Sequence, residues 1–161
     1  MLLQICRWLQ ENSWIVAING TAWAAATVEI VHYFSMFILV GSMVIVDLRV
    51  LGLVGRRLRA SQLADRLFPW MWISLTFNFL SGFLMFAGSA PSYYRNDIFY
   101  DKLTVILLAV AANVIVQKKI RAWDQLQAIP AWAKLLAAVS ICLWVGAILA
   151  GVEVPALTGV G

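Results

Sequence analysis

Residues 23–46 form a long apolar stretch that carries two ionisable side chains, and this combination limits the folds open to the chain. At about 1.5 Å per residue, a helix of this length reaches about 36 Å, enough to cross a hydrocarbon core of about 30 Å. Glu29 and His32 are three residues apart and so share one side of such a helix. Each would cost about 3 kcal/mol or more near the bilayer centre if it faced lipid. Both side chains must therefore face protein, water or a cofactor.

The composition is that of a protein that crosses a membrane several times. Of the 161 residues, 63% are hydrophobic and 12% are charged, which is unlike a soluble globular domain. Apolar runs and turn signals predict an all-α fold, a four-helix bundle that forms a single membrane domain over residues 1–161. The expected spans are about 22–46, 67–87, 98–117 and 130–150. Residues 1–19 are amphipathic and too polar to span, so they are expected to form a helix in the membrane interface.

The basic residues predict the orientation of these spans. Nine of the twelve lysines and arginines lie in residues 47–66 and 117–134, between spans. The positive-inside rule places both segments in the cytoplasm, and hence both termini on the opposite side. In a bacterial inner membrane that side is the periplasm. The positive charge is thus a topology signal, and we expect contacts with the lipid bilayer and with other membrane subunits or a second copy, not with nucleic acid.

Several polar side chains are expected to meet in the outer half of the bundle. At about 1.5 Å per residue, His32 lies about 13 Å below the outer boundary and Lys102 about 6 Å below it. Asn78 lies near mid-membrane, with Ser81 above it. Glu29 and Lys102 are expected to form an ion pair there, since pairing would keep both groups charged.

Three interpretations of this cluster remain open. In the first, the polar groups only pack the helices together. In the second, His32 ligates haem b, with Glu29 orienting the imidazole, Lys102 binding a propionate and Asn78 in the same site. The chain has one histidine, so the haem would be five-coordinate or take methionine, lysine or a partner chain as its sixth ligand. In the third, His32 binds copper or another metal, with methionines as soft ligands; these are Met36, Met43 and Met85.

Other chemistry finds no support in the sequence. The two cysteines, Cys6 and Cys142, have no metal-ligand spacing. There is no P-loop, no G-x-S-x-G and no H-E-x-x-H motif. Hydrolytic and nucleotide-dependent catalysis are therefore not expected.

The chain resembles an uncharacterised bacterial family of small four-helix membrane proteins that is filed as a domain of unknown function. The resemblance begins with E-x-x-H at residues 29–32 and V-D-L-R-x-L-G at residues 46–52. It continues through LFPW at 67–70, SGFLMFA at 81–87, a third span with Asn113, and LWVGAILAG at 143–151. Members of that family often carry histidine where Gln117 stands and arginine where Val152 stands.

More distantly, a histidine in the first span and a lysine that opens the third span are similar to J-type protoporphyrinogen oxidases, which bind haem b, and to CopD-type copper-resistance proteins. These likenesses imply haem or copper as the cofactor. We therefore expect a haem-binding or redox-associated membrane component that serves an electron-transfer or periplasm-facing oxidoreductase assembly. The alternatives are a cofactor-free structural subunit of a membrane complex and a copper-handling membrane protein.

Overall fold

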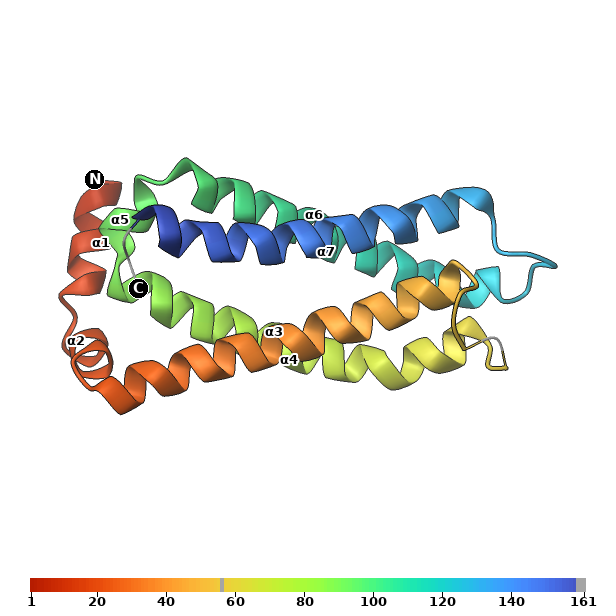
Figure 1. Cartoon of the computed structure of the whole chain (residues 1–161), viewed down its shortest axis with the longest axis horizontal. Coiled ribbons are helices and arrows are strands. Elements are labelled where there is room, and N and C mark those ends of the chain that lie inside the picture. The colour runs from red at the N-terminus through yellow and green to blue at the C-terminus, as the bar shows by residue number, and fades with distance from the viewer. Residues whose placement is uncertain (56, 159–161) are drawn as a thin grey trace.

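The chain folds into helices, with no strand among the residues that the structure describes, which confirms the all-α prediction. The structure is a computed structural model and describes residues 1–55 and 57–158 (Figure 1). Beyond Gly151 the side chains lie outside that description, including Val152, where the resembling family carries arginine. The helices are α1 (Leu2–Gln10), α2 (Ser13–Asn19), α3 (Ala22–Val50), α4 (Ala60–Gly88), α5 (Ala90–Tyr94), α6 (Asp97–Trp123) and α7 (Ala131–Thr158).

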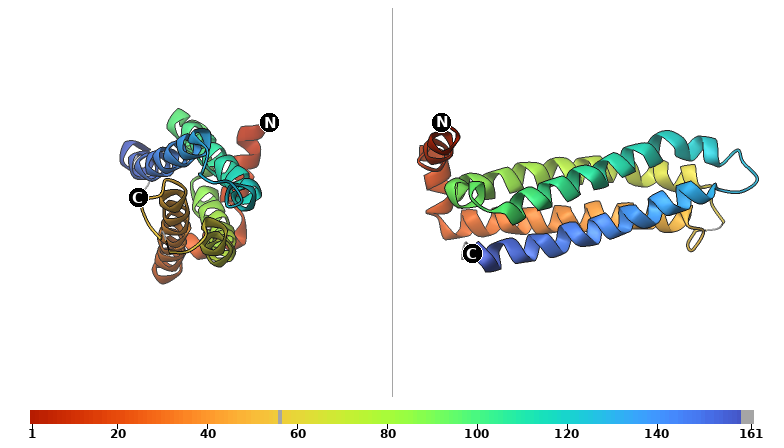
Figure 2. Two further views of the ribbon diagram at one scale, coloured as in Figure 1. Left: turned by 90° about the vertical axis from the view of Figure 1, so that its right-hand side faces the viewer. Right: turned by 90° about the horizontal axis from the view of Figure 1, so that it is seen from above.

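The four long helices form an antiparallel bundle in which each packs against two others. α3 lies between α4 and α7, and α6 lies between α7 and α4 (Figure 2). All four are long and apolar enough to cross a membrane. Large apolar side chains project from the bundle, including Trp23, Phe34, Phe79, Leu107 and Leu149. This outer surface fits a multi-pass membrane protein that contacts lipid.

The two ends of the bundle differ. One end, called here the basic-loop end, holds the connections at residues 51–59 and 124–130. The other end holds α1, α2 and α5, together with the last turns of α7 (Figure 1). Residues 1–19, predicted as one helix, are two short helices that fold across this α1–α2 end. The Gln10 side chain anchors them by donating to the carbonyl of Gly88 at 3.0 Å.

A glycine just beyond its last turn fixes the end of α3. The helix ends at Val50 because Gly52 follows with a φ of +80°, a conformation that glycine adopts without steric cost. The Gly52 amide donates to the carbonyl of Arg49 at 3.0 Å, and the Leu53 amide donates to the carbonyl of Leu48 at 2.9 Å. This pair of hydrogen bonds is the Schellman pattern of helix ends. The Arg49 guanidinium holds the returning chain by donating to the Leu58 carbonyl at 2.6 and 3.0 Å.

Asp124, which follows α6, joins the two connections at the basic-loop end. Its Oδ1 accepts from the Ala60 amide at 3.1 Å, and its Oδ2 accepts from the Ser61 amide at 2.8 Å. Both amides belong to the first turn of α4, where unpaired N–H groups and the helix dipole favour an anion. The carboxylate thus caps a helix from the other hairpin of the bundle.

An Asp124→Ala variant is expected to lower the free energy of unfolding by about 1–2 kcal/mol, because two helix-capping hydrogen bonds are lost. Burial alone would raise the pKa of this carboxyl, but hydrogen bonds from Ser61 and Ala60 outweigh it and lower the pKa below its ordinary value of 3.8. The stabilisation is therefore complete above that value and is lost as the pH falls through the lowered pKa. Chemical unfolding in detergent across the acid range measures both effects.

The matched control is Asp65→Ala, which breaks the exposed ion pair between Asp65 and Arg121 (3.0 Å). An exposed pair of this kind contributes about 0–1 kcal/mol. Equal losses in the two variants would contradict the capping role of Asp124.

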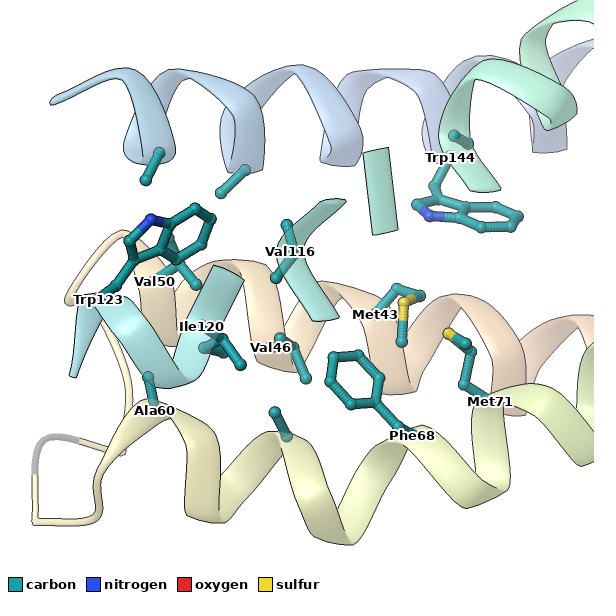
Figure 3. Packing of buried hydrophobic residues seen from close by; sticks show 14 of the residues in the cluster. Met43, Val46, Val50, Ala60, Phe68, Met71, Val116, Ile120, Trp123 and Trp144 are labelled. Carbon is teal, nitrogen blue, oxygen red and sulfur yellow. The ribbon is translucent and has the colours of Figure 1, made fainter. Parts of the chain in front are cut away.

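Buried apolar side chains concentrate in the half of the bundle next to the basic loops (Figure 3). They come from the second halves of α3 and α6 and the first halves of α4 and α7. Alanines at the contacts are fully buried and let the helices approach closely. The cluster consists of Leu39, Met43, Val46, Val50, Ala60, Ala64, Phe68, Met71, Ala109, Val116, Ile120, Trp123, Ala133, Ala137 and Trp144. The other half of the bundle is packed differently and contains a cavity.

Candidate functional site

The cavity lies among the four long helices towards the α1–α2 end and has a volume of about 390 Å³. This is within the usual range of ligand pockets, about 300–1,000 Å³. Its wall is mainly aromatic and aliphatic, and the polar groups in it are few. They are His32, Tyr33, Asn78, Tyr93 and Lys102. An apolar wall with a few convergent polar groups is typical of a ligand site.

The cavity reaches the outer surface of the bundle at α4 and α6. Phe79 and Phe83 of α4 and Leu103 of α6 all line it, yet their exposed fractions are 71%, 47% and 41%. Side chains that are both cavity wall and outer surface mark the mouth. Because that surface faces lipid in a membrane-embedded bundle, an apolar ligand can enter from the bilayer.

The imidazole of His32 is held by one ring nitrogen. Nδ1 lies 3.2 Å from the carbonyl oxygen of Asn78 and 3.1 Å from Oγ of Ser81. A carbonyl oxygen only accepts, so Nδ1 carries the hydrogen. The Ser81 hydroxyl donates its own hydrogen to the Phe77 carbonyl at 2.7 Å and so accepts from Nδ1 as well. In a neutral ring the lone pair is then on Nε2, for which the described residues supply no hydrogen-bond partner.

Asn78 fixes the position of His32 from the neighbouring helix. Its Nδ2 donates to the main-chain carbonyl of His32 at 3.0 Å, while its own carbonyl accepts from the imidazole. The Ser35 hydroxyl also donates to the His32 carbonyl, at 2.9 Å. The two bonds between His32 and Asn78 join α3 to α4 at the level of the cavity. The predicted proximity of His32, Asn78 and Ser81 is thus observed.

Gly82 lets α4 approach the imidazole closely. A Cβ atom at this position would lie 3.1 Å from Cε1 and 3.4 Å from Nδ1 of His32. The first distance is shorter than ordinary carbon–carbon contact. The ring is therefore confined between the Nδ1 hydrogen bonds and the bare backbone of Gly82. Sequence reasoning missed this residue, although its place beside Ser81 and four residues after Asn78 was a usable signal.

Lys102 reaches the cavity as predicted, but its predicted partner does not. Its ammonium lies beside α7, 3.4 Å from where a Cβ of Gly151 would be. Glu29 is exposed on α3 and does not line the cavity. Of the side chains described, only Arg121 and Asp65 form an ion pair, so the prediction of a Glu29–Lys102 pair was wrong. Three residues turn a helix by about 300°, which leaves Glu29 and His32 pointing about 60° apart.

The wall contains an aromatic cluster that sequence reasoning missed. The segment between the expected second and third spans was not predicted to be helical, but α5 forms there and buries Tyr93. Phe86 stacks on Phe99 with ring centroids 5.4 Å apart, and Tyr93 packs against both. Burial raises the pKa of the Tyr93 phenol, and the charges of Tyr33 and Glu29 raise it further. The imidazole of His32 is held by Asn78 and Ser81, so Glu29 does not orient it as predicted.

Metal ligation at this site would depend on few residues. Among the described residues, no group of three or more His, Cys, Asp or Glu side chains could hold a metal ion. Two of the three predicted methionines, Met36 and Met85, line the cavity with His32. The third, Met43, is 1% exposed in the packed half of the bundle.

Comparison with known proteins places the chain in a family. Comparisons with curated proteins and with solved structures gave no match. A family model described as a family of unknown function (DUF6644) matches residues 8–155. The match runs from α1 through all four long helices, so it includes every residue that lines the cavity. The chain therefore belongs to DUF6644, a family of unknown function.

Proposed function

We propose that the cavity binds haem b, with Nε2 of His32 as axial ligand, and that the protein is a redox component of its membrane. The observation that carries this proposal is the state of the imidazole. Its Nδ1–H is bound to a main-chain carbonyl, and its Nε2 is left with a lone pair beside an apolar cavity. Histidines that ligate metals commonly donate their second ring N–H to such a carbonyl, which fixes the tautomer and the ring orientation.

The rest of the wall fits a porphyrin. Aromatic and aliphatic side chains from four helices would cover its faces, and the mouth at α4 and α6 allows entry from lipid. Lys102 supplies the one ammonium among the cavity-lining residues and would pair with a propionate. When bound, haem supplies one-electron chemistry whose potential depends on the axial ligand and on burial. The thioethers of Met36 and Met85 lie in the same wall and would be able to hold the iron together with His32.

We infer that the site lies on the periplasmic side of a bacterial inner membrane. Support comes from the basic residues, nine of which lie in the segments at the far end of the bundle. The positive-inside rule directs that end to the cytoplasm. A haem on the opposite side is well placed to serve a periplasm-facing oxidoreductase or an electron-transfer assembly.

The test is an absorption spectrum of the full chain, purified in mild detergent after expression with a haem precursor. A Soret band, with about one haem per chain by pyridine haemochrome assay, is expected. Purified protein that remains free of haem, both as isolated and after titration with hemin, would contradict the proposal. A chain without cofactor that co-purifies stoichiometrically with other membrane proteins would favour the structural-subunit alternative.

Copper is the second candidate, because two thioethers share the cavity with His32 and such ligands suit Cu(I). Metal analysis of the same sample distinguishes the two. For copper, a Met36→Leu, Met85→Leu double variant is expected to lose the metal. For a haem ligated by His32 alone, that variant keeps the Soret band.

A further inference from the structure

A second polar cluster lies in the packed half of the bundle, far from the cavity. Its members are Asp47 of α3, Asn113 of α6 and Ser140 of α7, with exposed fractions of 1%, 3% and 0%. Asp47 follows His32 by fifteen residues, about 22 Å along the helix. Sequence reasoning grouped Asp47 with the basic segment after the first span. It is on the buried face of α3, four residues after Met43 and three before Val50.

The hydrogen bonds of this cluster do not balance if Asp47 is ionised. The Ser140 hydroxyl donates to Oδ1 of Asn113 at 3.2 Å, and it also faces the carboxyl group of Asp47. A hydroxyl has one hydrogen and cannot donate to both acceptors. Oδ2 of Asp47 is buried without a hydrogen-bond partner among the described residues. A carboxylate oxygen in that position is far costlier than the uncharged oxygen of a carboxylic acid.

No described cation compensates Asp47. Arg49, on the same helix, donates to the Leu58 carbonyl. Ser140, which bonds Asn113, lies beside the carboxyl group of Asp47, and the other buried side chains of this half of the bundle are mainly apolar. Asp124 accepts from two main-chain amides. The other described charged groups at this end are exposed, and two of them pair with each other; they are Arg57, Arg59, Asp65, Arg66, Lys118, Lys119, Arg121 and Lys134.

We propose that Asp47 is a proton-binding site inside the bundle. As the neutral acid it donates to Ser140, which donates to Asn113, so that a chain of hydrogen bonds joins α3, α7 and α6. The proton comes from water at the basic-loop end, because Asp47 lies one turn before α3 ends. Binding forms one O–H bond on the carboxyl group, and release returns the proton to water. Upon release the Ser140 hydrogen turns to the carboxylate, and Asn113 loses its donor.

The experiment is infrared spectroscopy of the full chain at neutral pH, in detergent, with and without carboxyl-¹³C-labelled aspartate. A carboxylic acid C=O band that shifts with the label is expected, because the other four aspartates are exposed or hydrogen-bonded as anions. The band should vanish in Asp47→Asn, whose amide can still donate to Ser140, and persist in Asp65→Asn. No labelled acid band in the wild-type chain, or a band that survives in folded Asp47→Asn, would overturn the proposal.

A second variant keeps the test decisive if Asp47→Asn does not fold. In Ser140→Ala the acid loses its acceptor, so the labelled band is expected to persist at a higher frequency. An unmoved band would overturn the donor chain. Raising the pH should remove the band in both the wild-type chain and Ser140→Ala, since only a titrating carboxyl can lose it.

Discussion

Replacing His32 with alanine is expected to remove the haem absorbance of the protein completely while the bundle stays folded. The chain has one histidine, so no second imidazole can take over the ligation. The fold should survive because Asn78 still donates to the main-chain carbonyl of residue 32, and the side chain is partly exposed to the cavity. The Soret absorbance per chain and the helical circular dichroism signal measure the two effects.

Two companion measurements sharpen this prediction. Imidazole added to the His32→Ala variant is expected to restore the band, because the vacated space retains Ser81 and the Asn78 carbonyl as acceptors. Tyr33→Phe is the control, since Tyr33 also lines the cavity but is not proposed as the ligand; it should keep the band. A folded His32→Ala variant with a full haem content would mean that the ligand is another residue.

A Gly82→Ala variant is expected to bind haem about 10–100-fold more weakly than the wild-type chain, the usual cost of disturbing a group that orients a metal ligand. The added methyl would meet the imidazole at 3.1 Å, so the ring must move away from its two acceptors. Titration of the haem-free protein with hemin gives the ratio of the dissociation constants.

Gly41→Ala is a matched control for this substitution. Gly41 is also within a long helix, but a Cβ there meets nothing within 4 Å. Its affinity for haem should equal that of the wild-type chain. If the two glycine variants bind haem alike, the contact between Gly82 and His32 does not set the geometry of the site.

The four long helices could be predicted because apolar length alone identifies membrane spans. The residues at which these helices begin and end were less predictable. α4 begins at Ala60, before the expected start of its span near residue 67, and α6 continues to Trp123, beyond the expected end of its span at residue 117. Helical hydrogen bonding does not stop where the apolar stretch stops, and α4 begins where Asp124 accepts from its first amides. A capping partner more than sixty residues away leaves no local sign in the sequence.

The candidate site could be predicted in part. The depth of each residue along its span predicted that His32, Asn78 and Lys102 lie close together, and all three line the cavity. It failed for Glu29, because depth does not say which way a side chain points around the helix. Asp47 was missed for a related reason. Its charged neighbours suggested a solvated segment beyond the first span, whereas its spacing from buried residues on α3 places it in the core.

The uneven packing of the bundle has a consequence for amide hydrogen exchange. Main-chain amides in the packed cluster of Figure 3 can exchange only when tightly packed helices separate. Exchange of amides around the cavity requires a smaller separation of the helices, because α4 and α6 are already partly apart at the mouth. A bound ligand should therefore slow exchange around Gly82 and Lys102 while leaving that around Val46 and Ile120 unchanged. Deuterium uptake would then report occupancy of the cavity even for a ligand that has no colour.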